Sequence, residues 1–96
     1  MKKLFSIKIL LKCQVESREV FEETLIMVDL ENIDNLKDKV HSYVDNLNKE
    51  YEDKILSLVS ILDYYEISEE IELKEDFAVL YSRFINREEL DLYPEF

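Results

Sequence analysis

Glycine and tryptophan are absent from this chain of 96 residues, and proline, cysteine and histidine each occur only once. Without glycine, phosphate-binding loops of the Walker or Rossmann type cannot form, because their backbone must approach the phosphate closely. We therefore expect no nucleotide and no other cofactor. Tight turns have to use Asn, Asp, Ser or Lys, which adopt a positive φ less readily than glycine.

Cys13 is the single cysteine, so no internal disulfide can form, which fits a reducing cytoplasm. No apolar run is long enough to span a bilayer. The basic start of the chain resembles that of a signal peptide, but Lys8 and Lys12 interrupt the segment that would have to be apolar. These observations predict a cytoplasmic protein that does not associate with membranes.

Acidic residues dominate the charge. Twenty-three Asp and Glu against twelve Lys and Arg give a net charge of −11. Such a surface repels nucleic acid, whose binding requires cations, and attracts basic proteins. Acidity also favours solubility in any chain, whatever its function.

The length and the apolar content of 47% indicate one globular domain over 1–96, with a core at 4–86 and a C-terminal tail at 87–96. Strand-like patterns occupy four segments, of which the first two are 4–15 and 20–30. The first is the strongest, because its apolar residues fall on every odd position.

The later strand-like segments are 55–66, which is apolar on both faces, and 77–86. Between 20–30 and 55–66, apolar residues recur at three- and four-residue steps over 33–51, which predicts an amphipathic helix preceded by Asn32 as its N-cap. The stripe comprises Ile33, Leu36, Val40, Tyr43, Val44, Leu47 and Tyr51.

A two-residue turn at Ser17 and Arg18 would pair the first two strands and place Lys12 opposite Glu23. The element order then predicts an α+β two-layer sandwich, in which one long helix covers a four-stranded antiparallel sheet of order 2-1-3-4. The other sheet face would be uncovered and partly apolar, a property typical of an interface. The apolar residues expected there are Leu10, Leu25 and Met27.

Several core segments are similar to a bacterial family, the domain-of-unknown-function 4288 family. They are Leu4–Leu11, Phe21–Val28, Val59–Glu66 and Leu80–Phe84, and the likeness covers about residues 4–85. The resemblance implies a small bacterial protein and supplies no activity or site residues.

No group of residues forms a catalytic pattern. His41 lies at the edge of the helical stripe, and Cys13 lies on the inward face of the first strand, where a small buried apolar residue is expected. No local pattern of metal ligands accompanies the histidine. Arg83 lies in an apolar strand, where it should pair with a neighbouring acid, reach the open sheet face or anchor an interface.

The acids are unevenly distributed. Residues 1–18 carry five cations and one acid, whereas 55–76 carries seven acids and one lysine. The loop at 67–76 is long for a connection in a compact domain, and it is either a solvated surface or a contact for a basic partner. The candidate partner-binding residues are Glu69, Glu70, Glu72, Glu75 and Asp76, followed by Glu22 and Glu23 on the second strand.

These features favour a non-enzymatic acidic binding protein, such as an immunity protein or inhibitor that neutralises a basic bacterial toxin, for example a nuclease. One alternative is an acidic decoy from a phage or mobile element that imitates nucleic acid. Another is a structural or regulatory homodimer formed through the open sheet face. An enzyme is the least favoured class.

Overall fold

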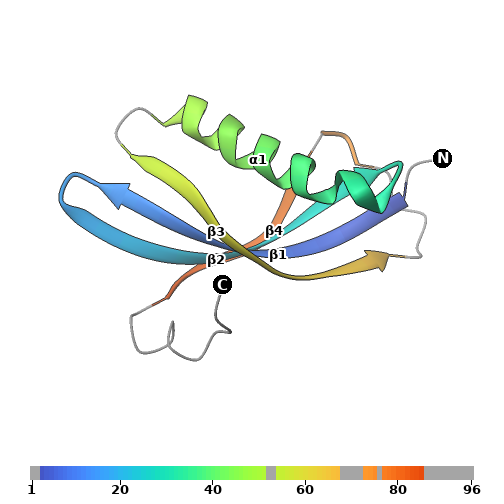
Figure 1. Ribbon diagram of the computed structural model, residues 1–96, viewed down its shortest axis with the longest axis horizontal. Helices are drawn as coiled ribbons and strands as arrows, with labels where there is room; N and C mark the ends of the chain where they lie inside the picture. The colour runs from blue at the N-terminus through green and yellow to red at the C-terminus, as the bar shows by residue number, and fades with distance from the viewer. Residues whose placement is uncertain (1–2, 52–53, 68–72, 76, 86–96) are drawn as a thin grey trace.

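The computed structural model describes residues 3–51, 54–67, 73–75 and 77–85, and it has an α+β fold with a four-stranded antiparallel sheet and one α-helix (Figure 1). The predicted fold class is therefore confirmed. The elements in chain order are β1 (Lys3–Val15), β2 (Arg18–Leu30), the 3-10 helix η1 (Ile33–Asn35), α1 (Leu36–Glu50), β3 (Ile55–Ile67) and β4 (Phe77–Ile85).

The strand order is β3-β1-β2-β4, and the predicted order 2-1-3-4 is wrong. β3 does lie beside β1, as expected, but β4 pairs with β2 at the opposite edge. The connection after β3 is thus a crossover between edges and not a hairpin. Three inter-strand spacings amount to about 14 Å, and nine linking residues can reach about 30 Å. The connection is therefore long enough to join the two edges of the sheet.

The β1–β2 hairpin turns one step earlier than the sequence suggested. Val15 pairs with Arg18, so the turn residues are Glu16 and Ser17, and Glu16 adopts a φ of 55°. In the absence of glycine, a glutamate takes the left-handed conformation that the two-residue turn requires. Lys12 consequently faces Phe21 and not Glu23. The predicted register was shifted by two residues, and because side chains alternate with a period of two, the face of each residue was still correct.

The helical stripe forms η1 and α1, which are joined at Leu36. Asn32 caps the start, where its Oδ1 accepts a hydrogen bond from the Asp34 amide at 3.1 Å. At the other end, the Asn48 side chain accepts from the Leu56 amide at 2.8 Å and donates to the Leu56 carbonyl at 2.9 Å. This pair of hydrogen bonds ties the end of the helix to the start of β3.

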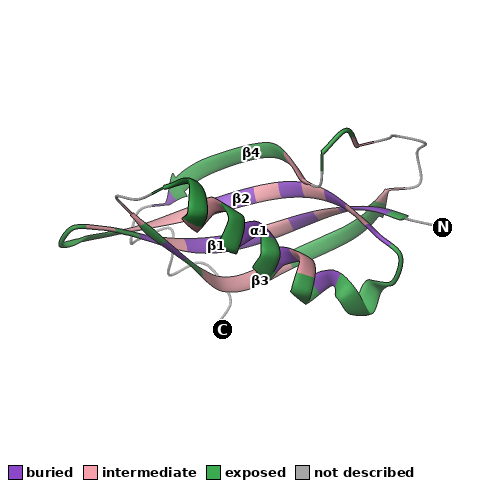
Figure 2. Cartoon of the chain, turned by 90° about the horizontal axis from the view of Figure 1, so that it is seen from above, coloured by how far each residue is buried: buried purple, intermediate pink, exposed green. Residues whose placement is uncertain are grey.

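α1 lies along one face of the sheet, and the buried residues concentrate beneath it (Figures 1 and 2). Ile33, expected in the stripe, is 41% exposed and lies outside this core. The buried cluster joins the four buried residues of α1 to the odd-numbered residues of β1 and to the C-terminal half of β2. Its members are Phe5, Ile7, Ile9, Leu11, Cys13, Ile26, Val28, Leu30, Leu36, Val40, Tyr43, Val44 and Leu56.

β4 is the least covered strand. Its first residue, Phe77, packs against Tyr43 of α1 with ring centroids 5.2 Å apart. Further along, Val79 is 53% exposed and Phe84 is 68% exposed. The helix therefore covers the sheet unevenly, and the β4 edge has apolar side chains in contact with solvent (Figure 2).

Candidate protein-binding surface

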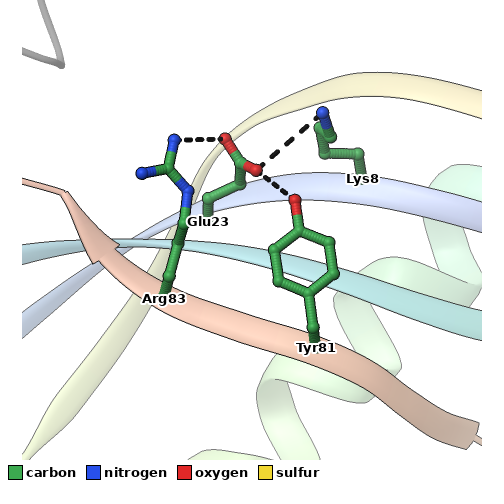
Figure 3. A network of polar contacts seen from close by, with 4 residues as sticks. All are labelled: Lys8, Glu23, Tyr81 and Arg83. Carbon is green, nitrogen blue, oxygen red and sulfur yellow. Dashed lines mark hydrogen bonds and ion pairs between the residues drawn. The ribbon is translucent and has the colours of Figure 1, made fainter.

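The sheet face opposite α1 has an ionic network at its centre. Glu23 of β2 is only 5% exposed, and its carboxylate interacts with side chains from both neighbouring strands (Figure 3). Lys8 of β1 places Nζ 3.8 Å from Oε1, and Arg83 of β4 places a guanidinium nitrogen 3.5 Å from Oε2. The Tyr81 hydroxyl donates a hydrogen bond to Oε1. The expectation that Arg83 pairs with a neighbouring acid is confirmed.

This network gives Glu23 a structural role. A buried carboxylate is costly unless it is paired and hydrogen-bonded, and here two cations and a hydroxyl meet that requirement. The pKa of Tyr81 is raised above its usual value, first because its hydroxyl donates to Glu23. A partner protein could reach Glu23 only by displacing these contacts, so the structure does not present it as the surface charge that the sequence suggested.

Glu22 lies on the opposite face of β2, the face that α1 covers, and is half-buried. The Thr24 hydroxyl donates to its Oε1 at 3.0 Å, and the Ser82 hydroxyl donates to the same oxygen. The two hydroxyl oxygens are 2.7 Å apart. Like Glu23, this acid helps join β2 to β4. The predicted order placed the second strand and its acids at a sheet edge, whereas β2 is an interior strand.

A groove of about 350 Å³ separates α1 from β4 on the helix face. Its floor is apolar, from Phe77 and Val79, and exposed carboxylates from Glu50 and Glu75 lie at its rim. Tyr43, Asn46 and Leu47 complete the lining. The arrangement suits a side chain with an apolar stem and a cationic head.

The chemistry of this groove already favours positive charge. The Nζ atom of Lys39 lies 5.2 Å from the centre of the Phe77 ring, within the range of a cation–π contact. Burial raises the pKa of Tyr43 to about 12, with a further contribution from the negative charges of Glu22 and Glu50. Ionisation of the phenol is opposed first by burial and then by these neighbouring negative charges.

The predicted acidic contact segment is only partly described. Glu75 is exposed and stands directly before β4, at the rim of the groove. The other acids proposed for this segment lie outside the described residues: Glu69, Glu70, Glu72 and Asp76.

The open face has a second, smaller hollow of about 240 Å³ beside the Glu23 network. Lys8 and Asp63 line it and lie opposite one another in the neighbouring strands β1 and β3. Ser6, Leu25 and Tyr65 form the rest of its lining. Leu10, Leu25 and Met27 all lie on this face, as expected. Leu25 and Met27 are partly exposed, but Leu10 is fully buried.

Of the two residues that could suggest catalysis, His41 is exposed on α1 and Cys13 is a buried free thiol in the core. Within 3–51, 54–67, 73–75 and 77–85, no three Asp, Glu, His or Cys side chains come together as a metal site. In the same part of the chain, no helix has the length and apolar character that crossing a membrane requires.

Sequence reasoning did not find the four-residue network of Lys8, Glu23, Tyr81 and Arg83. The available signal was the presence of two cations, Lys8 and Arg83, within strands that are otherwise largely apolar. Joining them required the β2–β4 pairing, which places Arg83 opposite Glu23.

Comparison with known proteins gives no relative: no family model, no curated protein and no solved structure matches this chain. The similarity to the domain-of-unknown-function 4288 family therefore stays a prediction.

Proposed function

We propose that this chain is a non-enzymatic acidic protein-binding domain whose partner is a basic protein. The observation that carries the proposal is the net charge of −11 on only 96 residues. An excess of this size draws cationic proteins by long-range attraction and speeds their encounter.

The described contacts support the proposal because three cations are each paired with an acid of the sheet. Lys8 and Arg83 both interact with Glu23, and Lys3 lies 3.2 Å from Glu66. These cations are thereby partly neutralised by acids of the sheet. Exposed acids such as Glu16, Glu31 and Asp45 add to the negative surface around it.

The biological role that best suits such a domain is that of an immunity protein or inhibitor that neutralises a basic toxin, such as a nuclease, in the cytoplasm. We take the fold as a two-layer sandwich in which α1 supports the sheet from one side. The rim acids Glu50 and Glu75, together with the acidic segment 69–76, would steer the toxin. The groove between α1 and β4 would receive one of its basic side chains.

The test begins with affinity capture from the native host, elution by a salt gradient and mass spectrometry of the eluted proteins. The proposal predicts a basic protein whose activity is lost when the two purified proteins are mixed, and His41→Ala should inhibit equally well. Capture of nucleic-acid enzymes whose DNA or RNA competes for the same surface would favour the decoy. If no basic protein binds the purified chain, the proposal is wrong.

A further inference from the structure

The outer edge of β4 is an apolar strand edge whose protection is limited to one charged residue, Arg83, and one bulge, at Leu80. Within the part of the chain that the structure describes, no strand pairs with β4 on the side away from β2. Free strand edges carry unpaired N–H and C=O groups and commonly bind another chain unless charge, proline or coverage prevents it. β4 runs over nine residues, contains no acid and no proline, and has Arg83 as its one charged residue.

Exposed apolar side chains gather on this strand. Val79, Leu80, Tyr81 and Phe84 are each more than one-third exposed, so β4 contributes four of the nine exposed large apolar residues of the described chain. Val79 and Phe84 both lie on the helix face of β4, and Val79 also belongs to the groove floor. A partner at this edge would bury these side chains and satisfy the edge hydrogen-bonding groups together.

The charges of β4 indicate which molecule binds at its free edge. A basic partner is attracted to acids, and β4 has none. For a second copy of this acidic chain, β4 is a surface on which like charges do not meet. We propose that β4 pairs antiparallel with β4 of a second copy across a two-fold axis and forms a continuous eight-stranded sheet.

The β4 bulge restricts the register of this pairing. Leu25 opposes Tyr81 and Ile26 opposes Val79, so Leu80 is an extra residue at which the faces exchange. Phe77 and Val79 therefore face α1 before the bulge, and Ser82 and Phe84 do so after it.

Residues opposite one another in antiparallel strands share a face. This condition is met when Phe77 lies opposite Phe84 of the second copy and Val79 lies opposite Ser82 of the second copy. In the same register Ala78 lies opposite Arg83 of the second copy, so each guanidinium keeps its own Glu23 and the two arginines stay apart. The two helices then flank a shared apolar strip made of two Phe77–Phe84 pairs.

The dimer and the basic-partner complex should respond to salt in opposite directions. Each copy carries −11, so the copies repel at long range and salt should strengthen the dimer. Salt should weaken binding of a basic protein. The dimer does not rest on the proposed function, although Phe77 and Val79 belong both to the β4 edge and to the groove floor.

Sedimentation equilibrium of the full chain across a dilution series, at low and high salt, tests the proposal. The expected mass approaches twice 11.6 kDa at high concentration, and the dissociation constant falls as salt rises. Val79→Lys and Phe84→Lys should each weaken the dimer at least tenfold, because both place a cation in the apolar strip.

Ile55→Lys is the matched control, since Ile55 is a 64% exposed apolar residue on the opposite edge strand β3. It should leave the dimer intact, and circular dichroism should show all three variants folded. A wild-type chain that is monomeric throughout the series would overturn the proposal. So would a dimer that Ile55→Lys disrupts and Val79→Lys does not.

Discussion

The two faces of the sheet are stabilised by different means. Beneath α1 the contacts are apolar, and Val40, Ile7 and Ile26 are completely buried there. On the opposite face, a buried carboxylate at Glu23 holds three strands together through Lys8, Tyr81 and Arg83 (Figure 3). Apolar packing tolerates small shifts of one strand against another. A paired carboxylate, in contrast, requires particular residues of β1, β2 and β4 to be neighbours.

This difference explains how an acidic chain keeps a stable sheet. Two adjacent acids of β2 point to opposite faces, and each is used to attach β4: Glu22 through Ser82 and Glu23 through Arg83. Negative charge inside the fold is therefore matched locally. The acids that remain exposed are the ones that a partner can meet.

The apolar face should be the more sensitive to charge. Val40→Asp would bury an unpaired carboxylate in the core and should lower the free energy of unfolding by more than about 3 kcal/mol. Urea denaturation and thermal melting would measure the loss. Ser42→Asp, on the exposed side of the same helix, is the control and should change stability by less than about 0.5 kcal/mol. Wild-type stability in Val40→Asp would mean that α1 does not cover the core.

The polar face should give a smaller but clear effect. Glu23→Ala leaves two half-exposed cations and the Tyr81 hydroxyl without their acceptor, and it should cost about 1–3 kcal/mol. Glu23→Gln keeps one accepting oxygen and should cost less. Glu19→Ala removes an exposed acid of the same strand and should be nearly neutral in the same urea titrations. Equal losses from Glu19→Ala and Glu23→Ala would show that only net charge matters.

At alkaline pH, a third and weaker contribution to the stability of the fold should become measurable, that of the Tyr43 phenol. Its pKa is raised to about 12 from 10.0, so the folded state holds a proton that the unfolded state releases. Stability from this source is complete below pH 10 and declines as pH rises towards 12. Tyr43→Phe should flatten the decline in urea midpoints over this window and remove a late-titrating tyrosine from the absorbance at alkaline pH. Tyr64→Phe, at an exposed tyrosine, should do neither.

Local patterns predicted every element of the sheet and the helix, because period-two and helical spacings depend on neighbours along the chain. The extent of β1 and the cap at Asn32 are examples. The position of β4 was not predictable in this way. Both β3 and β4 are apolar enough to occupy either edge of the sheet. The pairing of β4 with β2 depends on side-chain contacts such as that between Glu23 and Arg83, which are sixty residues apart in the sequence.

The candidate site was predicted less well than the fold. A count of acids treats Glu22, Glu23 and Glu75 alike, although the first two are held inside the sheet and only Glu75 is exposed. Whether a carboxylate is free or paired depends on the strand opposite it. The hairpin register was wrong because the turn uses Glu16, at a positive φ, and Ser17, in place of the expected Ser17 and Arg18.

The central claim is that the acids of the segment 69–76 steer a basic partner more strongly than the exposed acids outside this segment do. Stopped-flow association with the captured partner over a salt series tests it directly. Reversal of Glu69, Glu70, Glu72 and Glu75 to Lys should slow association much more than it speeds dissociation, and it should flatten the salt dependence. The matched control reverses four exposed acids elsewhere, Glu16, Glu19, Glu31 and Asp45, and so makes the same change in net charge.

The account predicts that the first variant associates at least tenfold more slowly than the control variant at low salt, with both folded by circular dichroism. Equal association rates for the two variants, or a wild-type rate indifferent to salt, would contradict it.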